Sequence, residues 1–272
     1  MQNKKIVSII SGAFSLARPD KLLQIGGFRR AFVFAYFLYK KLFEDPFLNL
    51  VRRKPELFQN GDILDIGANI GYTSAVFAGA LNPDANVYAF EPDQMCYRLL
   101  EQVILRKNLT GSIEAINMAV GSFDGHIEFW HNEKHPADHR VVTKRFGSSQ
   151  PDATKISTVP VTTVDTFVRN RHLRNISFIK VDVQGYELAV CEGMKDTLER
   201  FPETCVCLEY APHALMEIGF EPGKVLDFFR SRGYRLHILT RGTPLVADDE
   251  SLKRIVNDAG YVDLLCSKRA VV

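Results

Sequence analysis

A short apolar segment that ends in a glycine turn constrains the fold of this chain more than any other feature. Residues 62–66 form the apolar run, which contains Asp65, and Gly67-Ala68-Asn69-Ile70-Gly71 follows directly. Glycines allow a tight turn and a close approach of the backbone to a ligand. A helix that begins behind the turn would present free N–H groups there. The segment therefore predicts a buried strand, a ligand-binding turn and a helix in succession.

The rest of the chain continues this alternation of strands and helices. We expect seven strands near residues 63–66, 86–90, 112–117, 176–183, 204–209, 235–240 and 261–267, and helices near residues 72–81, 93–107, 187–200 and 223–231. Alternation at this spacing indicates an α/β fold with a mostly parallel sheet and helices on both faces. The chain has 272 residues, of which 46% are hydrophobic, so it is long enough to bury such a core.

Two segments fall outside this alternation. We interpret residues 1–60 as an N-terminal helical extension that precedes a main domain at residues 61–272, and residues from about 122 to 160 as a polar insertion with a hairpin near residues 125–130. The apolar run 31–39 is shorter than the about 20 residues that a membrane-spanning helix needs. Its basic flanks leave open a peripheral contact with an anionic membrane surface, but packing on the main domain is favoured.

Charge and cysteine content exclude other classes of protein. The 34 basic and 32 acidic residues give a formal charge of +2, whereas a nucleic-acid-binding protein normally shows a dense basic face. The five cysteines are scattered and odd in number. This favours buried structural thiols in a reducing compartment over disulfides, so we expect a cytoplasmic location. Serines interrupt the apolar run at residues 6–17, so a signal peptide is not expected.

The glycine turn lacks the phosphate-binding patterns. Asn69 stands where a dinucleotide-binding turn has its second glycine, and no Lys-Ser/Thr pair ends a P-loop. Glu91 ends the next predicted strand, where an acid can accept hydrogen bonds from both ribose hydroxyls. An isolated glutamate there is more often a surface carboxylate, but the preceding turn favours a binding role. Together they predict a nucleoside ligand without a phosphate and with a charged amino-acid tail.

The chain resembles the FkbM family of class I S-adenosylmethionine-dependent methyltransferases over about residues 58–235. The resemblance rests on the order and spacing of six motifs. These are Asp65-Ile66-Gly67-Ala68-Asn69-Ile70-Gly71-Tyr72-Thr73, Phe90-Glu91-Pro92, Ala119-Val120-Gly121, Val161-Thr162-Thr163-Val164-Asp165, Ile179-Lys180-Val181-Asp182-Val183-Gln184-Gly185-Tyr186-Glu187 and Leu208-Glu209. It implies a Rossmann-like fold with a seven-stranded sheet and S-adenosylmethionine as the cofactor.

The resemblance also implies which residues bind the cofactor. The methionine end would lie against Asp65, Gly67, Asn69, Gly71 and the adjoining Tyr72. The ribose would be held by Glu91, beside Pro92, and the adenine would lie near Met118 and Ala119, with Asp182 also near the cofactor. One departure is visible, because the family pattern commonly has Asp-x-Glu-Gly where this chain has Asp182-Val183-Gln184-Gly185.

Three residues are candidates for the general base that a hydroxyl nucleophile needs. Asp182 and Glu209 end neighbouring predicted strands, at the sheet edge where ligands bind, and His213 follows shortly after Glu209. For His213, a helix-start histidine without a role is favoured. Asp182 and Glu209 could also hold magnesium, but a reaction without metal is favoured.

The histidines of the insertion offer a second set of candidates. His126, His131, His135 and His139 match the spacing of no standard metal site. Contact with the acceptor substrate is a second role for His135, His139 and Arg140, although a solvated loop is favoured.

The expected function is O-methyl transfer from S-adenosylmethionine to a hydroxyl of a sugar, glycan or polyketide-type natural product. One alternative is a nucleic-acid or other N-methyltransferase. Such enzymes often carry Asn/Asp-Pro-Pro-aromatic where this chain has Asp182-Val183-Gln184-Gly185, which argues against it. A second alternative is a cofactor-binding scaffold without catalysis.

Overall fold

A mixed α/β sheet forms the centre of the protein, whose computed structural model describes residues 26–41, 45–132, 139–147 and 151–271. Within these ranges, eight strands pair in the order β11-β10-β12-β9-β8-β1-β2-β3. The pairs from β9 to β3 are parallel, and those that join β9, β12, β10 and β11 are antiparallel. The strands are β1 (Asp62–Ile66), β2 (Val87–Phe90), β3 (Ile113–Ile116), β8 (Ile176–Val181), β9 (Cys205–Tyr210), β10 (Arg235–Ile238), β11 (Leu245–Val246) and β12 (Val262–Ser267).

This arrangement confirms the predicted Rossmann-like α/β fold, with one difference at the sheet edge. All seven expected strands are present, and β11 adds an eighth. The strand β11 is only two residues long, and Leu245 and Val246 are both exposed. So short a strand has no alternation of apolar and polar residues by which the sequence could have revealed it.

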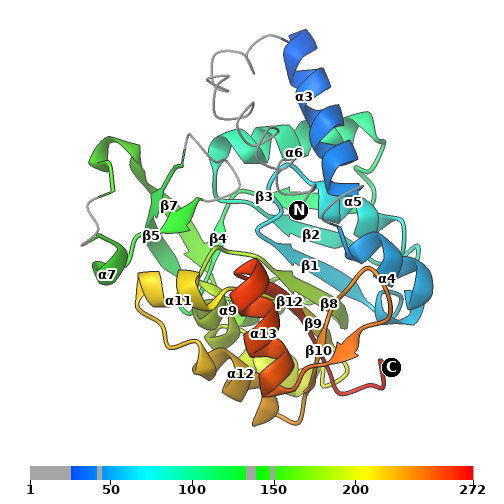
Figure 1. The fold of residues 1–272 in the computed structure, drawn as a ribbon. Helices are drawn as coiled ribbons and strands as arrows, with labels where there is room; N and C mark the ends of the chain where they lie inside the picture. The colour runs from blue at the N-terminus through cyan, green and yellow to red at the C-terminus, as the bar shows by residue number, and fades with distance from the viewer. Residues whose placement is uncertain (1–25, 42–44, 133–138, 148–150, 272) are drawn as a thin grey trace.

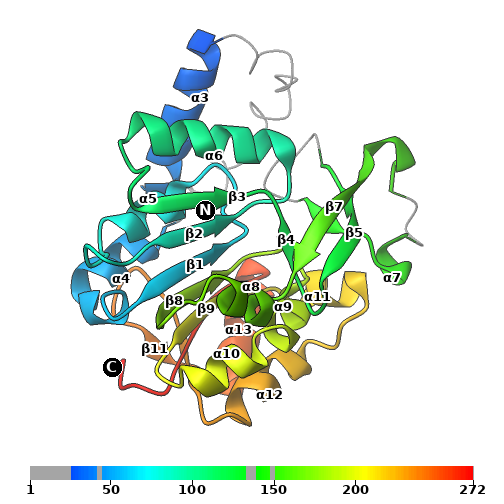
Figure 2. The ribbon, with the colours of Figure 1, turned by 180° about the vertical axis from the view of Figure 1, so that it is seen from behind.

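Two hydrophobic cores lie on opposite faces of the sheet because successive side chains of a strand point to opposite sides. Leu64 and Ile66 of β1 belong to the core under α8, α9, α10, α12 and α13. Ile63 belongs to the core under α4, α5 and α6. Figures 1 and 2 show these two layers of helices. Their bounds are α4 (Phe47–Arg53), α5 (Tyr72–Ala78), α6 (Gln94–Arg106), α8 (Val164–Asn170), α9 (Glu187–Glu192), α10 (Lys195–Arg200), α12 (Gly223–Arg230) and α13 (Asp249–Ala259).

The helix expected at residues 187–200 is divided into α9 and α10 at Gly193. A Cβ atom on Gly193 would lie 2.0 Å from the carbonyl oxygen of Gly121, so the backbones meet too closely for a side chain. The helix α6 starts later than Pro92. Asp93 is its N-cap, and the carboxylate accepts hydrogen bonds from the amides of Met95 and Cys96.

The polar insertion is a second, four-stranded sheet rather than a loop. Its strands pair in the order β4-β7-β5-β6 within the described part of the chain. The expected strand near residues 125–130 is present, and it pairs with β7 and β6. Phe129, Val141 and Val161 of this sheet pack on α9 and α11 (Pro212–Ile218). The remaining elements are β4 (Ala119–Val120), β5 (Gly125–Trp130), β6 (Arg140–Val141), α7 (Lys144–Gly147), η3 (Ala153–Lys155) and β7 (Ile156–Thr162).

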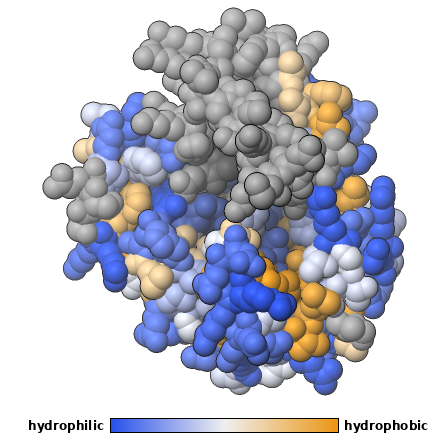
Figure 3. Space-filling view, viewed as in Figure 1, coloured by the Kyte–Doolittle hydropathy of each residue, from blue (hydrophilic) through white to orange (hydrophobic). Residues whose placement is uncertain are grey.

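The N-terminal extension is helical where it is described, with α3 (Gly26–Tyr39), α4 and the 3₁₀ turn η2 (Pro55–Leu57). One side of α3 packs Val33, Tyr36 and Phe37 against the main domain. Phe34 and Leu38 remain exposed, and Figure 3 shows an apolar surface on this helix. In the described ranges, none of the helices has the length and apolar character needed to cross a membrane. Residues 6–17, where a signal peptide was not expected, lie outside those ranges. Peripheral membrane contact stays a prediction, as does the domain boundary at residue 60.

The five cysteines all lie in described positions, and each is buried and forms no disulfide. Burial raises the pKa of each thiol, Cys205 for example to about 12. They therefore act as small apolar core residues, as the sequence predicted.

An aromatic cluster under β8 provides a test of this core. The Phe178 ring lies 4.6 Å from Phe58 and 5.4 Å from Phe77 between centroids, and all three side chains are fully buried. We expect Phe178→Ala to lower the free energy of unfolding by about 3–5 kcal/mol, because it leaves a cavity among rings that cannot collapse into it. Urea denaturation measures this, with Phe123→Ala, at an exposed ring, as the control. Equal small losses in both variants would contradict the assignment of this core.

Candidate active site

A cavity of about 430 Å³ opens at the carboxyl ends of β1, β2, β8 and β9. This is the edge of a parallel sheet where ligands bind in open α/β folds. Its lining includes the glycine turn and Glu91 as well as Asp182 and Glu209. Tyr36 and Lys40 from the N-terminal extension and Phe129, His139 and Val141 from the second sheet also line it. The cavity therefore brings together segments from the whole described chain.

The glycine turn is packed directly against the loop that follows β8. Gly67 has φ +78°, and a Cβ atom there would lie 1.9 Å from the carbonyl oxygen of Asp182. The amides of Gly67 and Ala68 donate to the carbonyl of Phe90. Gly67 and Asn69 line the cavity, as does Tyr72 at the start of α5, whereas Gly71 precedes that helix behind the lining. Only a glycine can occupy position 67 without moving the neighbouring loop.

Glu91 is a buried acid that faces the cavity beside the turn. Oε2 accepts the amide hydrogen of Asn69 at 2.8 Å, and Oε1 accepts that of Asp93 at 2.8 Å. Burial raises the pKa of the Glu91 carboxyl to about 8, although these two amides act to lower it. Each oxygen keeps a further lone pair for a ligand hydroxyl. Pro92, Met118 and Ala119 line the same part of the cavity.

Asp65 lies behind the cavity wall, although the sequence placed it at the methionine end of the ligand. Its side chain is fully buried and does not line the cavity. Oδ2 accepts the hydroxyl of Ser74 at 2.6 Å, and Oδ1 lies 3.4 Å from Nζ of Lys180. Asp65 can therefore act on a ligand only through Lys180 and the turn.

Lys180 is a site residue that sequence reasoning missed. It lies on β8, is 6% exposed and lines the cavity. Nζ donates to the carbonyl of Gly67 at 2.8 Å and lies 3.4 Å from both Asp65 and Asp182. Burial alone would lower the pKa of Lys180, but the charges of Asp182 and Asp65 raise it above its ordinary value. The signal was a lysine inside a strand that is otherwise nearly apolar, since lysine is almost never fully buried unless it is paired.

Asp182 and Glu209 meet at the other end of the cavity, where one amide joins them. Nε2 of Gln184 donates to Oδ1 of Asp182 at 2.9 Å and to Oε1 of Glu209 at 3.1 Å. Burial would raise the pKa of Asp182, but Lys180 and Lys40 hold it below its ordinary value. Burial and the charges of Asp182 and Asp263 raise the pKa of Glu209 well above its ordinary value.

The donor set at this end suits a hydrogen-bonding ligand better than a metal ion. The N–H groups of Gln184 point at the carboxylate oxygens that an ion such as magnesium would need, and amide nitrogens are not ligands for hard cations. His213 does not join this group. It is 80% exposed, lies 3.5 Å from Glu217 on its own helix and does not line the cavity.

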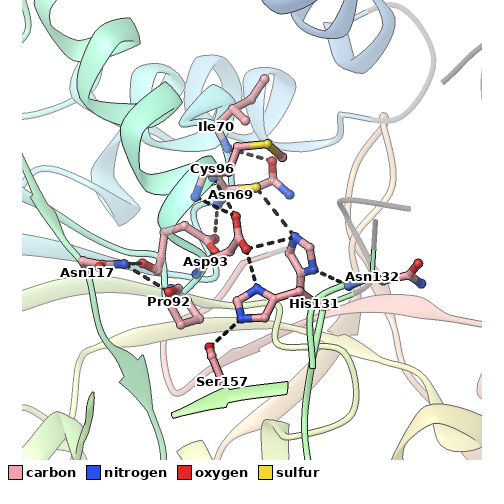
Figure 4. A network of polar contacts seen from close by, with 12 residues as sticks. Asn69, Ile70, Pro92, Asp93, Cys96, Asn117, His131, Asn132 and Ser157 are labelled. Carbon is pink, nitrogen blue, oxygen red and sulfur yellow. Dashed lines mark hydrogen bonds and ion pairs between the residues drawn. The ribbon is translucent and has the colours of Figure 1, made fainter. Parts of the chain in front are cut away.

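A polar network joins the second sheet to the main domain beside Glu91 (Figure 4). Nδ1 of His131 donates to Oδ2 of Asp93 at 2.6 Å, and Nε2 lies 2.6 Å from the hydroxyl of Ser157. Burial would raise the pKa of Asp93, but the hydrogen bond from His131 and the neighbouring His139 lower it to about 2. The interpretation of this segment as a solvated loop is therefore wrong for His131 and His139.

Asp93, His131 and His139 approach one another closely enough for a metal site, with their ligand atoms within 4.8 Å. However, Nδ1 of His139 accepts the amide hydrogen of Asn132 at 2.9 Å, so the ring proton lies on Nε2, the atom that faces Asp93. A metal-binding histidine instead donates from its second nitrogen. The geometry is that of a hydrogen-bonded network.

The expected acceptor-contact residues separate in the structure. His139 lines the cavity. Arg140 points away from it and pairs with Glu217 on α11. His135 lies outside the described residues, and His126 is exposed on β5.

The bond between His131 and Asp93 gives a pH-dependent prediction. Because it holds the pKa of Asp93 below the ordinary 3.8, its stabilisation is complete above that value and disappears as the pH falls toward 2. We expect His131→Ala to reduce the free energy of unfolding by about 1.5–3 kcal/mol at pH 7 and by less near pH 3, where part of this stabilisation is lost. Urea titrations at both pH values measure this, with His126→Ala as the control. A loss that is the same at both pH values would argue against the ionic bond.

Comparison with known proteins identifies the family. The model of the methyltransferase FkbM domain matches residues 65–236. The chain is 27% identical to the methyltransferase sdnD of Sordaria araneosa over 187 residues. The aligned region covers 60% of this chain and 70% of sdnD. It is 29% identical to the hexuronic acid methyltransferase AglP of Haloferax volcanii over 157 residues. That aligned region covers 56% of this chain and 57% of AglP.

A solved structure agrees at the level of the fold. The methyltransferase FkbM of Methylobacillus flagellatus superposes with a TM-score of 0.50 at 17% identity. The superposition covers 85% of this chain but only 50% of that protein, so this chain spans half the length of that relative. The family match covers more than half of the chain and includes both ends of the cavity, and the protein therefore belongs to the FkbM methyltransferase domain family.

Proposed function

We propose that this protein is an S-adenosylmethionine-dependent O-methyltransferase that acts on a hydroxyl of a sugar, glycan or polyketide-type natural product. The observation that supports this best is the continuity of one cavity. At one end lie the glycine turn and Glu91, and at the other lie Asp182 and Glu209. A nucleoside site and a pair of carboxylates that can accept a hydroxyl proton thus share one cavity.

The residues at the first end fit the cofactor by their chemistry. Glu91 presents a buried carboxyl with free lone pairs, which suits two ribose hydroxyls. Met118, Ala119 and Phe90 offer apolar surface for a planar base. The turn at Gly67 and Asn69 lets the backbone approach the amino-acid tail. When bound, S-adenosylmethionine supplies a methyl group on a positively charged sulfur.

Asp182 and Glu209 have different roles in this proposal. The stronger base is the carboxylate with the higher pKa, and that is Glu209. Asp182, next to Lys180, stays ionised and can accept a hydrogen bond from the acceptor. Glu209 would accept the proton of the acceptor hydroxyl. Bound S-adenosylmethionine would supply the methyl group to the hydroxyl oxygen and, as its bond from sulfur to the methyl carbon breaks, would leave as S-adenosylhomocysteine. Orientation by these groups supplies most of the catalysis that the protein itself contributes.

Two observations support the proposed class of acceptor, the name of one relative and the residues that line the cavity. AglP is named for a hexuronic acid, which is a sugar, and carboxylates that line a cavity are good partners for hydroxyl groups. An N-methyltransferase is less favoured, because the segment after β8 is Asp182-Val183-Gln184-Gly185 and holds no prolines or aromatic residue to grip a planar amine.

Calorimetric titration with S-adenosylhomocysteine tests the cofactor site, with NAD as the comparison ligand. We expect binding of the former alone, and about a tenfold loss of affinity in Glu91→Ala. Each tenfold step corresponds to about 1.4 kcal/mol, and two lost hydrogen bonds of about 0.5–1.5 kcal/mol each reach this value. Glu101→Ala, at an exposed position on α6, is the control. Unchanged affinity in Glu91→Ala, or binding of NAD instead, would contradict the assignment.

The acceptor end makes a separate prediction. With tritiated S-adenosylmethionine and a panel of methyl glucuronides, methyl glucosides and hydroxylated polyketides, we expect Glu209→Gln to reduce kcat by about 10²–10⁴-fold. Asp182→Asn should also lose turnover, while both variants keep their affinity for S-adenosylhomocysteine within about tenfold. Asp258→Asn, on the exposed side of α13, is the control.

The wild-type rate should rise with pH as Glu209 loses its proton. Wild-type rates in Glu209→Gln would exclude it as the base. Cofactor binding without turnover on any acceptor would favour the scaffold alternative.

A further inference from the structure

The loop after β8 holds Gln184 in an unusual backbone conformation. Gln184 has φ +53°, in the left-handed region that residues with side chains seldom adopt. The next residue, Gly185, has φ +104°, and a Cβ atom there would lie 2.7 Å from the carbonyl oxygen of Ala214. A turn of this kind persists only where surrounding contacts fix it.

Glu187 provides those contacts from the start of α9. Its Oε1 accepts the amide hydrogens of Val183 at 3.1 Å and of Gly185 at 3.2 Å. Glu187 is fully buried. The amides on both sides of Gln184 are therefore tied to one carboxylate, and the Gln184 side chain is aimed into the cavity, which it lines.

The amide of Gln184 then connects two acids from neighbouring strands. Its Nε2 donates to both Asp182 and Glu209, at 2.9 and 3.1 Å. An amide nitrogen carries two hydrogens, so both donors are used. Without this shared donor, the ionised side chains of Asp182 and Glu209 would repel each other and could move apart.

The charges around Glu209 make this donor more important. Asp182, Asp263 from β12 and Glu187 from α9 raise the pKa of Glu209 together with burial, and Lys40, which follows α3, lowers it. Lys180 from β8 acts on Asp182 and Asp263. Asp45 and Asp65 also belong to this group of charges, so acids outnumber the two lysines, Lys40 and Lys180. A glutamate at position 184 would add another acid and remove both hydrogen bonds.

We propose that Gln184 is a positioning residue for the general base, which holds the Glu209 carboxylate against Asp182 so that both face the acceptor hydroxyl. This inference rests on the proposed function, since it assigns a purpose to the same pair of acids. It also gives a reason for the departure from Asp-x-Glu-Gly in this chain. The neutral amide joins the acids without adding to their charge.

A carboxyl titration by ¹³C NMR tests the inference without any acceptor or cofactor. Asp Cγ and Glu Cδ are labelled, and the signals are assigned with Asp182→Asn and Glu209→Gln. In Gln184→Met, which keeps the length of the side chain but lacks donors, we expect the midpoint of Glu209 to rise by about one pH unit, because a hydrogen bond to the ionised form is lost. In Gln184→Glu the rise should be larger, since a like charge is added.

Two further variants keep the test decisive. Gln94→Glu, at the exposed first residue of α6, adds the same charge elsewhere and should leave both midpoints unchanged. If Gln184→Met does not fold, Gln184→Asn replaces it, because asparagine tolerates the left-handed region but is too short to reach both acids.

The inference would be overturned if the titration midpoints of Asp182 and Glu209 in the folded Gln184 variants stayed within about 0.2 pH unit of wild type. Failure to bind S-adenosylhomocysteine, measured separately, would overturn the proposed function and leave this result readable.

Discussion

One buried cation, Lys180, holds the working parts of this site together. Its Nζ contacts the carbonyl of the glycine turn and lies between Asp65 on β1 and Asp182 after β8. Lys180 and Asp65 are buried while Asp182 is partly exposed. Taking such charges out of water is costly unless each has a partner. Removing any one of the three would leave an uncompensated charge under the turn. Gly67 also lies close to the backbone of Asp182, so the glycine turn and the loop after β8 are packed directly against each other.

Around this junction, the cavity is completed by segments that do not belong to the central sheet. The second sheet contributes Phe129, Val141 and His139, and it is tied to the main domain through His131 and Asp93. The N-terminal extension contributes Tyr36 and Lys40. The second sheet thus completes the cavity beside Glu91, whereas Lys40 of the N-terminal extension lies near Asp182 and Glu209.

The sequence predicted the elements whose signal is local. The strands β1, β2, β3, β8 and β9 are mainly apolar runs, and the helices α5, α6, α9 and α12 were expected from the same kind of local pattern. Glu91 followed from its place at the end of a strand behind a glycine turn. Asp65 was expected to line the cavity and instead lies beneath its wall. The alternation of a strand does not show which of its polar side chains reaches the cavity. Lys180 and the Asp93–His131 contact were missed for a related reason, since the partners of each lie far away in the sequence.

What the sequence determined by itself was the order of strands and helices, the glycine turn and the family, because each is written in neighbouring residues. Only the tertiary structure decided which charges meet. It brought Lys180 beneath the turn, aimed Gln184 between Asp182 and Glu209, directed His213 and Arg140 away from the cavity and folded the polar insertion into a sheet beside Glu91. The physical reason is that electrostatic and hydrogen-bonding partners act over a few ångströms of space, whereas periodicity in a sequence reports only on the face of one element.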